Sequence, residues 1–113
     1  MTTGVFNEKV CPTIGTSFKT QSFPTDDGQV LLQIWDTAGQ ERYNSLAPLY
    51  YRSAELAVIV FDLTSIVSYN SVNHWLKELD EKASPDLPRV VVGNKLDLMD
   101  ERKITENETQ SII

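Results

Sequence analysis

The chain has 113 residues, of which 41% are apolar and 23% charged, a balance typical of one ordinary globular domain and not of a disordered chain. Sixteen acidic and ten basic side chains give a formal net charge of −6. We expect no nucleic acid among its partners, because a phosphate backbone is recognised by clustered Lys and Arg. Cys11 is the single cysteine, which excludes an internal disulfide and suits a reducing compartment.

Neither end of the sequence carries a recognisable targeting signal. Residues 1–6 lack the apolar core of a signal peptide, and no stretch approaches the roughly 20 apolar residues of a membrane span. The last three residues, Ser111-Ile112-Ile113, offer no cysteine for prenylation. We therefore expect a cytoplasmic chain with no membrane anchor of its own.

The first part of the chain predicts a β-hairpin. Residues 16–23 mix apolar and polar side chains on both faces, as an edge strand does. Residues 25–28, Thr-Asp-Asp-Gly, are typical of a turn. Residues 29–36 then have the alternation of a strand, which places Val30, Leu32 and Ile34 on one face and Leu31, Gln33 and Trp35 on the other. Residues 37–52 have no steady period, and Pro48 limits any helix there.

The second part predicts alternating strands and helices. Residues 56–61 and 89–93 are short apolar runs, typical of strands buried on both faces of a sheet. Between them, Ser65 can cap a helix that runs to about Lys82, and Thr105 can begin a last helix. The apolar stripe of the first helix consists of Tyr69, Val72, Trp75, Leu76 and Leu79. This order of elements indicates an α/β fold with parallel strands.

Three polar clusters lie beside predicted strands. Residues 36–41 and 94–97 each follow a strand directly, where open α/β sheets bind their ligands, and residues 12–15 precede the first hairpin strand. Taken singly, an Asp after a strand is more often a helix cap, and an Asn-Lys pair is more often a turn. Their order and spacing along the chain are more informative than any one of them.

Together the three clusters resemble the signature of the small GTPases of the Ras superfamily. Pro12-Thr13-Ile14-Gly15 resembles the first switch, Asp36-Thr37-Ala38-Gly39-Gln40-Glu41 the second switch, and Asn94-Lys95-Leu96-Asp97 the guanine-specificity motif. Tyr50-Tyr51-Arg52 resembles the Rab branch, the vesicle-traffic GTPases, and Ser45-Leu46-Ala47-Pro48 is most similar to its early-endosomal members. Members of that group attach to endosomal membranes through a prenylated tail.

The resemblance implies an incomplete Ras-like P-loop NTPase fold, with a mostly parallel sheet and one antiparallel edge hairpin. It runs from about Val10 onward, so we expect residues 1–113 to form one partial small-GTPase domain. The first strand, the last strand and the last helix of the family have no counterpart in the sequence.

The resemblance also implies GTP or GDP and Mg²⁺ as ligands. Thr13 and Asp36 would bind the metal, and Thr13 and Gly39 would place backbone amides near the γ-phosphate. Gln40 would orient the attacking water. Asn94 would bind the edge of the guanine base.

Lys95 and Asp97 would complete the recognition of the base. The stem of Lys95 would lie along the ring, and the Asp97 carboxylate would accept hydrogen bonds from two N–H groups of guanine. The family's effector surface matches Ile14, Phe18, Trp35 and Tyr50. The implied partners are Rab effectors, exchange factors and GTPase-activating proteins.

The phosphate-binding loop, Gly-x-x-x-x-Gly-Lys-[Ser/Thr], is absent from the 113 residues. The five glycines stand at positions 4, 15, 28, 39 and 93, and none is followed by lysine. The loop supplies the backbone amides and the lysine that neutralise the phosphates. We therefore expect a chain truncated at both ends whose nucleotide binding is impaired, and whose GTP hydrolysis is weak or absent.

Three functional hypotheses stay open at this point. The chain is a truncated Rab-type GTPase, a nucleotide-free interaction module that presents the switch and effector surface, or an inactive α/β fragment. Guanine-nucleotide titration separates the first from the others, and effector binding separates the second from the third.

Overall fold

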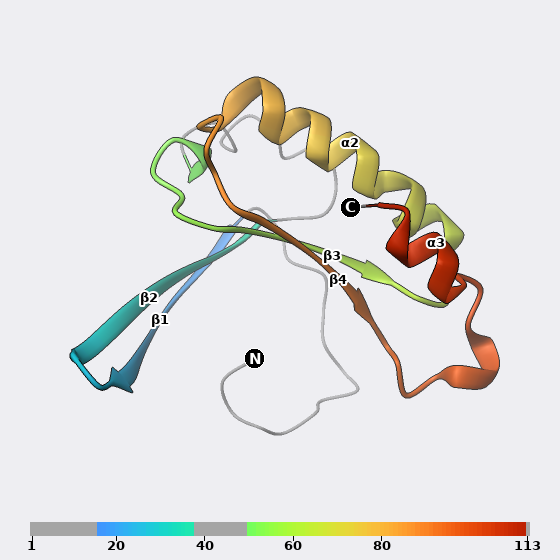
Figure 1. The fold of residues 1–113 in the computed structure, drawn as a ribbon, viewed down its shortest axis with the longest axis horizontal. Helices are drawn as coiled ribbons and strands as arrows, with labels where there is room; N and C mark the ends of the chain where they lie inside the picture. The colour runs from blue at the N-terminus through green and yellow to red at the C-terminus, as the bar shows by residue number, and fades with distance from the viewer. Residues whose placement is uncertain (1–15, 38–49, 113) are drawn as a thin grey trace. The chain divides into compact units, whose positions relative to one another are not determined.

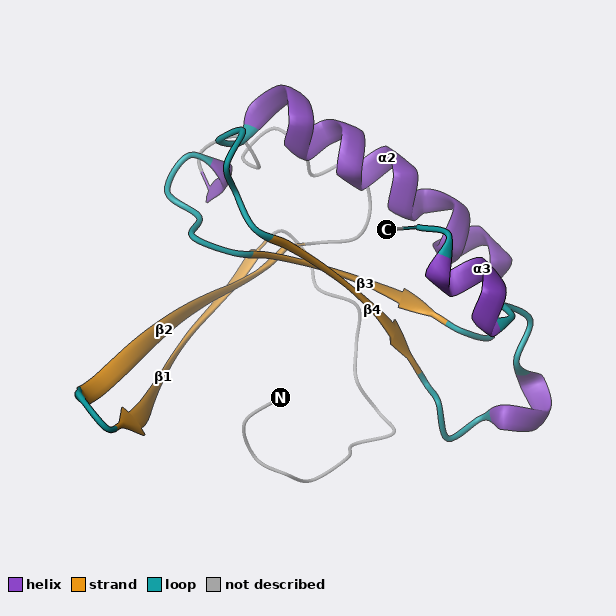
Figure 2. Cartoon of the chain, in the orientation of Figure 1, coloured by secondary structure: helices purple, strands orange, loops and turns teal. Residues whose placement is uncertain are grey.

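The computed structural model describes residues 16–37 and 50–112, which fall into two compact units. The hairpin unit comprises residues 1–50 and the α/β unit residues 51–113. Figure 1 labels the strands of both units and the helices α2 and α3, and Figure 2 distinguishes helices, strands and loops. Whether residues 1–113 act as one partial domain stays a prediction.

The hairpin unit contains the predicted pair of strands, β1 (Thr16–Thr25) and β2 (Gly28–Thr37). They are antiparallel, with Thr25 opposite Gly28 and Thr16 opposite Thr37. Gly28 has φ +136°, a backbone conformation that side chains disfavour, which explains the glycine at the start of β2. Both strands run further toward the turn than predicted, because Asp26 and Asp27 alone connect them.

The α/β unit contains the predicted alternation of strands and helices. Its elements are β3 (Ala57–Asp62), α2 (Ile66–Lys82), β4 (Arg89–Asn94), the short 3₁₀ helix η2 (Met99–Glu101) and α3 (Glu106–Gln110). β3 and β4 are parallel neighbours, with Ala57 opposite Arg89 and Asp62 opposite Asn94. The chain thus forms a β-α-β crossover, and the expected α/β fold with parallel strands and one antiparallel hairpin is confirmed.

Both predicted helix starts are confirmed by their capping hydrogen bonds. The Ser65 side chain accepts a hydrogen bond from the Ser68 amide (3.3 Å), and the Thr105 side chain accepts one from the Glu108 amide (3.3 Å). The Glu108 carboxylate in turn accepts from the Thr105 amide (2.8 Å), which completes a capping box. In the described segments, no helix is both long enough and apolar enough to cross a membrane.

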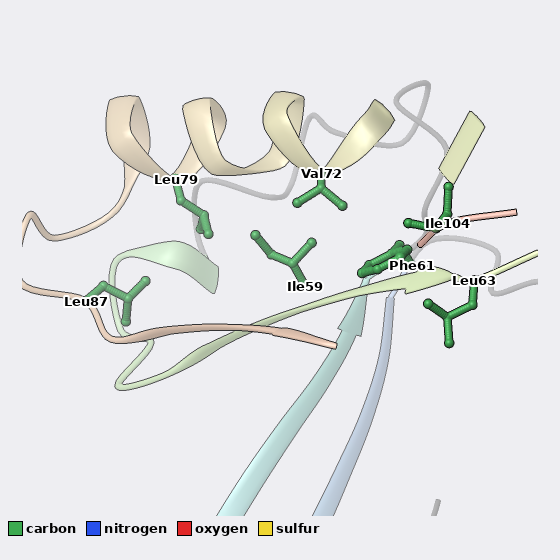
Figure 3. Close-up of a cluster of buried hydrophobic side chains, with 7 residues drawn as sticks. All are labelled: Ile59, Phe61, Leu63, Val72, Leu79, Leu87 and Ile104. Atoms are coloured by element: carbon green, nitrogen blue, oxygen red, sulfur yellow. The ribbon is translucent and has the colours of Figure 1, made fainter. Parts of the chain in front are cut away.

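The core of the α/β unit lies between α2 and one face of β3. Figure 3 shows Val72 and Leu79 of α2 directed toward Ile59 of β3, with Phe61 and Ile104 adjoining. The predicted stripe of α2 faces this core, because Tyr69, Trp75 and Leu76 pack against it while partly buried. The buried side chains of this core are Ile59, Phe61, Leu63, Val72, Leu79, Leu87 and Ile104.

The expectation that β3 and β4 are buried on both faces is wrong for this structure. Val58 and Val90, which are opposite each other, are 54% and 45% exposed, and Val60 and Val92 are exposed on the same face. Alternate residues of a strand point to opposite faces, and α2 packs on only one face of β3. The apolar run of β3 therefore supplies one buried row, Ile59 and Phe61, and one exposed row, whereas in β4 Val91 is only half-buried.

Candidate functional site

The turn after β4 holds all three residues predicted to recognise a guanine base. β4 ends at Asn94, and the Leu98 amide donates to the Lys95 carbonyl (3.1 Å), which closes a tight turn over residues 95–98. The Asn94 Oδ1 atom accepts from the Lys95 amide (2.8 Å). Asn94, Lys95 and Asp97 are all exposed, so the turn leaves the three side chains accessible from solvent.

Close packing at the carboxyl ends of β3 and β4 anchors this turn. The Leu63 amide donates to the Asn94 carbonyl (3.1 Å), which extends the pairing of the two strands by one residue. A Cβ atom at Gly93 would lie 2.9 Å from Leu63 Cδ2, so only glycine allows this approach without a shift. The backbone that carries the three candidate base-binding residues is therefore fixed to the core.

Lys95 itself has a constrained backbone. Its φ is +63°, in the left-handed region that residues other than glycine seldom adopt. The hydrogen bonds to Asn94 and from Leu98 hold this conformation. Such constrained residues tend to occur at binding sites, which agrees with the predicted role of the turn.

Asp62 faces this turn from the end of β3 and was missed by the sequence analysis. Its Oδ2 atom lies 2.8 Å from Lys95 Nζ, and its Oδ1 atom accepts hydrogen bonds from the Thr64 amide (2.8 Å) and hydroxyl (2.7 Å). A signal for it existed, because Asp62 is a polar residue directly after the predicted strand 56–61. The same signal identified Asp36 and Asn94.

The ion pair shifts the protonation equilibria of both partners. Burial raises the pKa of Asp62, but the hydrogen bonds from Lys95 and Thr64 outweigh it and leave the pKa below its usual value. The hydrogen bond to Asp62 raises the pKa of Lys95, and the charges of Asp62, Glu101 and Asp97 add to the effect. Both groups are therefore charged at neutral pH.

Three of the four predicted effector residues form a continuous row in the hairpin unit. Phe18 and Trp35 are directly opposite each other in the strand register, and their ring centroids lie 4.6 Å apart. The rings of Trp35 and Tyr50 are also 4.6 Å apart. Phe18 and Trp35 are 49% and 46% exposed, so this aromatic row (Phe18, Trp35 and Tyr50) presents broad apolar surface.

Of the remaining predicted site residues, the structure describes only Asp36. Thr13, Ile14, Gly39 and Gln40 lie outside the described residues. Asp36 lies near the end of β2, opposite Ser17, and is exposed. Its carboxylate oxygens suit Mg²⁺, a cation that prefers oxygen ligands. Across residues 16–37 and 50–112, no group of three or more His, Cys, Asp or Glu residues could hold a metal ion.

Comparison with known proteins places these features in a family. The family model described as the Ras family matches residues 1–113. Among curated proteins, the Ras-related protein RABF2b of Arabidopsis thaliana is 46% identical over 99 residues, which are 88% of this chain and 50% of that relative. The chain thus spans about half the length of the curated relative it matches.

Proposed function

This chain belongs to the Ras family as a Rab-like small GTPase, and from that premise we propose that it binds guanine nucleotides through residues 94–97. The observation that carries the proposal is the tight turn after β4, which presents Asn94, Lys95 and Asp97 on one fixed backbone. The activity we propose for the complete site is GTP hydrolysis in a cytoplasmic switch for endosomal vesicle traffic. In a chain of these 113 residues we expect that hydrolysis to be weak or absent.

Asp97 supplies the preference for guanine over adenine. Two neighbouring N–H groups on the edge of guanine can donate to one carboxylate, whereas adenine offers a different pattern of donors and acceptors. Hydrogen bonds to a charged group contribute about 1.5–3 kcal/mol each, which is enough to select one purine. Asn94 adds a contact to the base edge, and Lys95 covers the ring with its aliphatic stem.

The phosphate end of the nucleotide is held less well by these 113 residues. They contain no Gly-x-x-x-x-Gly-Lys-[Ser/Thr] sequence, the element that surrounds phosphates with backbone amides and a lysine. Thr13 and Gly39 would place amides near the γ-phosphate, and Thr13 and Asp36 would hold Mg²⁺. The metal would neutralise phosphate charge when bound. Gln40 would orient the water that attacks the γ-phosphate.

A fluorescence titration tests this proposal on the whole chain. A fluorescent guanine nucleotide is added in the presence of Mg²⁺, with the matching adenine nucleotide as the control ligand. We expect binding of the guanine nucleotide alone, with a dissociation constant weaker than micromolar. Equal binding of both purines would contradict base recognition, and micromolar or tighter binding would contradict a weakened phosphate site.

Replacing Asp97 by asparagine should change which base is preferred. Asp97→Asn exchanges one acceptor oxygen for a donor. A base that offers an acceptor at that edge therefore gains a hydrogen bond to residue 97, and guanine loses one. We expect the preference to move from guanine nucleotides toward xanthine nucleotides in competition titrations. Asp100→Asn, which makes the same change in exposed η2, is the matched control and should leave the preference unchanged.

A second function, the binding of Rab effectors, exchange factors or GTPase-activating proteins, is favoured by the aromatic row. Exposed aromatic side chains are enriched at protein interfaces. Phe18→Ala and Trp35→Ala should weaken the capture of a Rab effector. Phe23→Ala is the matched control, because Phe23 is as exposed as Trp35 (46%) but lies on the opposite face of β1. Equal loss in all three variants would exclude the row as the contact surface, and failure of both functions would leave an inactive fragment.

A further inference from the structure

Asp62 and Lys95 form an ion pair across the carboxyl ends of β3 and β4. The Lys95 ammonium lies 2.8 Å from Asp62 Oδ2. The lysine side chain is 52% exposed and the aspartate side chain 22% exposed. The aspartate is therefore the more enclosed partner of the pair.

The Asp62 carboxylate is itself held in place by the segment that leads into α2. The Thr64 amide and hydroxyl both donate to its Oδ1 atom, at 2.8 and 2.7 Å. The Asp62 backbone amide donates to the Ser68 hydroxyl (3.0 Å) in the first turns of α2. These bonds leave Oδ2 directed to Lys95, so the acceptor that the lysine meets has a fixed position.

The backbone of Lys95 is fixed as well, which leaves its side chain as the variable part. Asn94 and Leu98 hold the backbone through the hydrogen bonds of the turn. A lysine side chain has four rotatable bonds, and ordering them when a ligand binds reduces affinity. A partner that orders the side chain beforehand removes part of that loss.

We infer that Asp62 is a positioning residue for guanine binding: it holds the Lys95 ammonium at the end of β3, so that the lysine stem is ordered before the base arrives. The inference rests on the proposed function. Asp62 touches no part of the nucleotide in this scheme and acts through Lys95 alone.

A purely electrostatic role for Asp62 predicts the opposite result. Asp62, Asp97 and Glu101 all act on Lys95 as negative charges, and a negative charge near the site repels an anionic nucleotide. If Asp62 were only such a charge, Asp62→Asn would strengthen the binding of GDP. If Asp62 positions Lys95, the same substitution weakens the binding of GDP and of uncharged guanosine alike.

The test is an NMR titration of the whole chain with guanosine and, separately, with GDP, followed through the amide signals of residues 94–98. We expect Asp62→Asn to weaken both ligands by about two- to tenfold, the range that corresponds to ordering one long side chain. Asp80→Asn is the matched control, because it makes the same charge change in another ion pair, with Arg89. It should leave both affinities unchanged.

A double variant separates positioning from a general structural effect. In a Lys95→Met background the ammonium is gone, so Asp62→Asn should cause no further loss of affinity. A further loss of similar size would show that Asp62 acts by another route and would overturn the inference. So would tighter binding of GDP by Asp62→Asn.

A second readout needs no ligand and distinguishes failure of this inference from failure of the proposed function. In ¹⁵N spectra of the lysine ammonium groups, Lys95 should titrate at higher pH in the wild-type chain than in Asp62→Asn. If the wild-type chain binds no guanosine or GDP while this difference is present, the proposed function is wrong and the ion pair is confirmed. If the difference is absent, the inference is overturned whatever the chain binds.

Discussion

The two units bury their apolar residues to very different extents. In the α/β unit, Val72 and Ile104 are 1% and 2% exposed and belong to a cluster of seven buried side chains. In the described part of the hairpin unit no residue is buried, and Leu31 and Trp35 are 60% and 46% exposed. Both units have regular hydrogen-bonded strands, so backbone pairing by itself does not produce a core. A helix packed on a sheet face does, because it removes whole rows of side chains from water.

The largest expected difference between the units concerns core substitutions. Ile104→Ala removes a side chain that is 2% exposed, so we expect a loss of about 2–5 kcal/mol in the free energy of unfolding of the α/β unit. Leu31→Ala, in the hairpin, should change the free energy of unfolding by less than about 0.5 kcal/mol. Urea unfolding followed by far-UV circular dichroism measures the stability of both variants. Equal losses would contradict the claim that the α/β unit has a core and the hairpin does not.

A smaller effect is expected from overpacking the same core. Gly93→Ala places a Cβ atom 2.9 Å from Leu63 Cδ2, and Leu63 is buried, so a shift is required. We expect a loss of about 1–3 kcal/mol, measured by the same unfolding experiment. Ala57→Gly, at the start of β3, provides a comparison without added volume. If Gly93→Ala leaves both the stability and the amide shifts of residues 94–98 unchanged, the close packing of Gly93 against Leu63 would be contradicted.

The cap at the start of α2 should contribute less to stability than the core packing does. Ser65→Ala removes the hydroxyl that accepts from the Ser68 amide, and we expect a cost of about 1 kcal/mol. Ser71→Ala is the control, because the Ser71 hydroxyl bonds the Val67 carbonyl within the helix and caps nothing. Thermal unfolding of the two variants side by side measures the difference. Indistinguishable midpoints would mean that the cap does not stabilise α2.

The smallest expected effect is a pH dependence from Asp62. Its pKa is lower in the folded chain than the unfolded value of about 3.9, so its contribution to stability is present above that pH. The contribution is lost as the pH falls through the lower folded-state pKa. The stability difference between wild type and Asp62→Asn should therefore shrink in acid, measured by urea unfolding from pH 6 down to pH 3. A stability difference that stays constant from pH 6 to pH 3 would contradict a stabilising ion pair between Asp62 and Lys95.

Local patterns in the sequence predicted the elements of the fold well. Alternation and the Thr25–Gly28 turn predicted the hairpin, and Ser65 and Thr105 predicted two helix starts that the capping bonds confirm. The exposed row of Val58, Val60, Val90 and Val92 was not predictable, because an apolar run does not say how many of its faces are covered. That depends on which elements pack together, which is a tertiary property.

The candidate site was predictable to a similar degree. Asn94, Lys95 and Asp97 are close in sequence, so one turn brings them together, and the structure does so. Asp62 is more than thirty residues away from Lys95, and only the parallel pairing of β3 and β4 places the two side chains at one edge. The roles of Thr13, Gly39 and Gln40 stay predictions.

The most direct test of the central claim is a comparison of two NMR titrations of the unmodified chain, one with GDP and one with ADP. The claim is that the turn after β4 still recognises guanine in a chain of these 113 residues. We predict that GDP shifts the amide signals of residues 94–98 and saturates only above micromolar concentration, while ADP leaves them in place. Identical shifts with both nucleotides, or GDP shifts confined to residues far from the turn, would contradict the account.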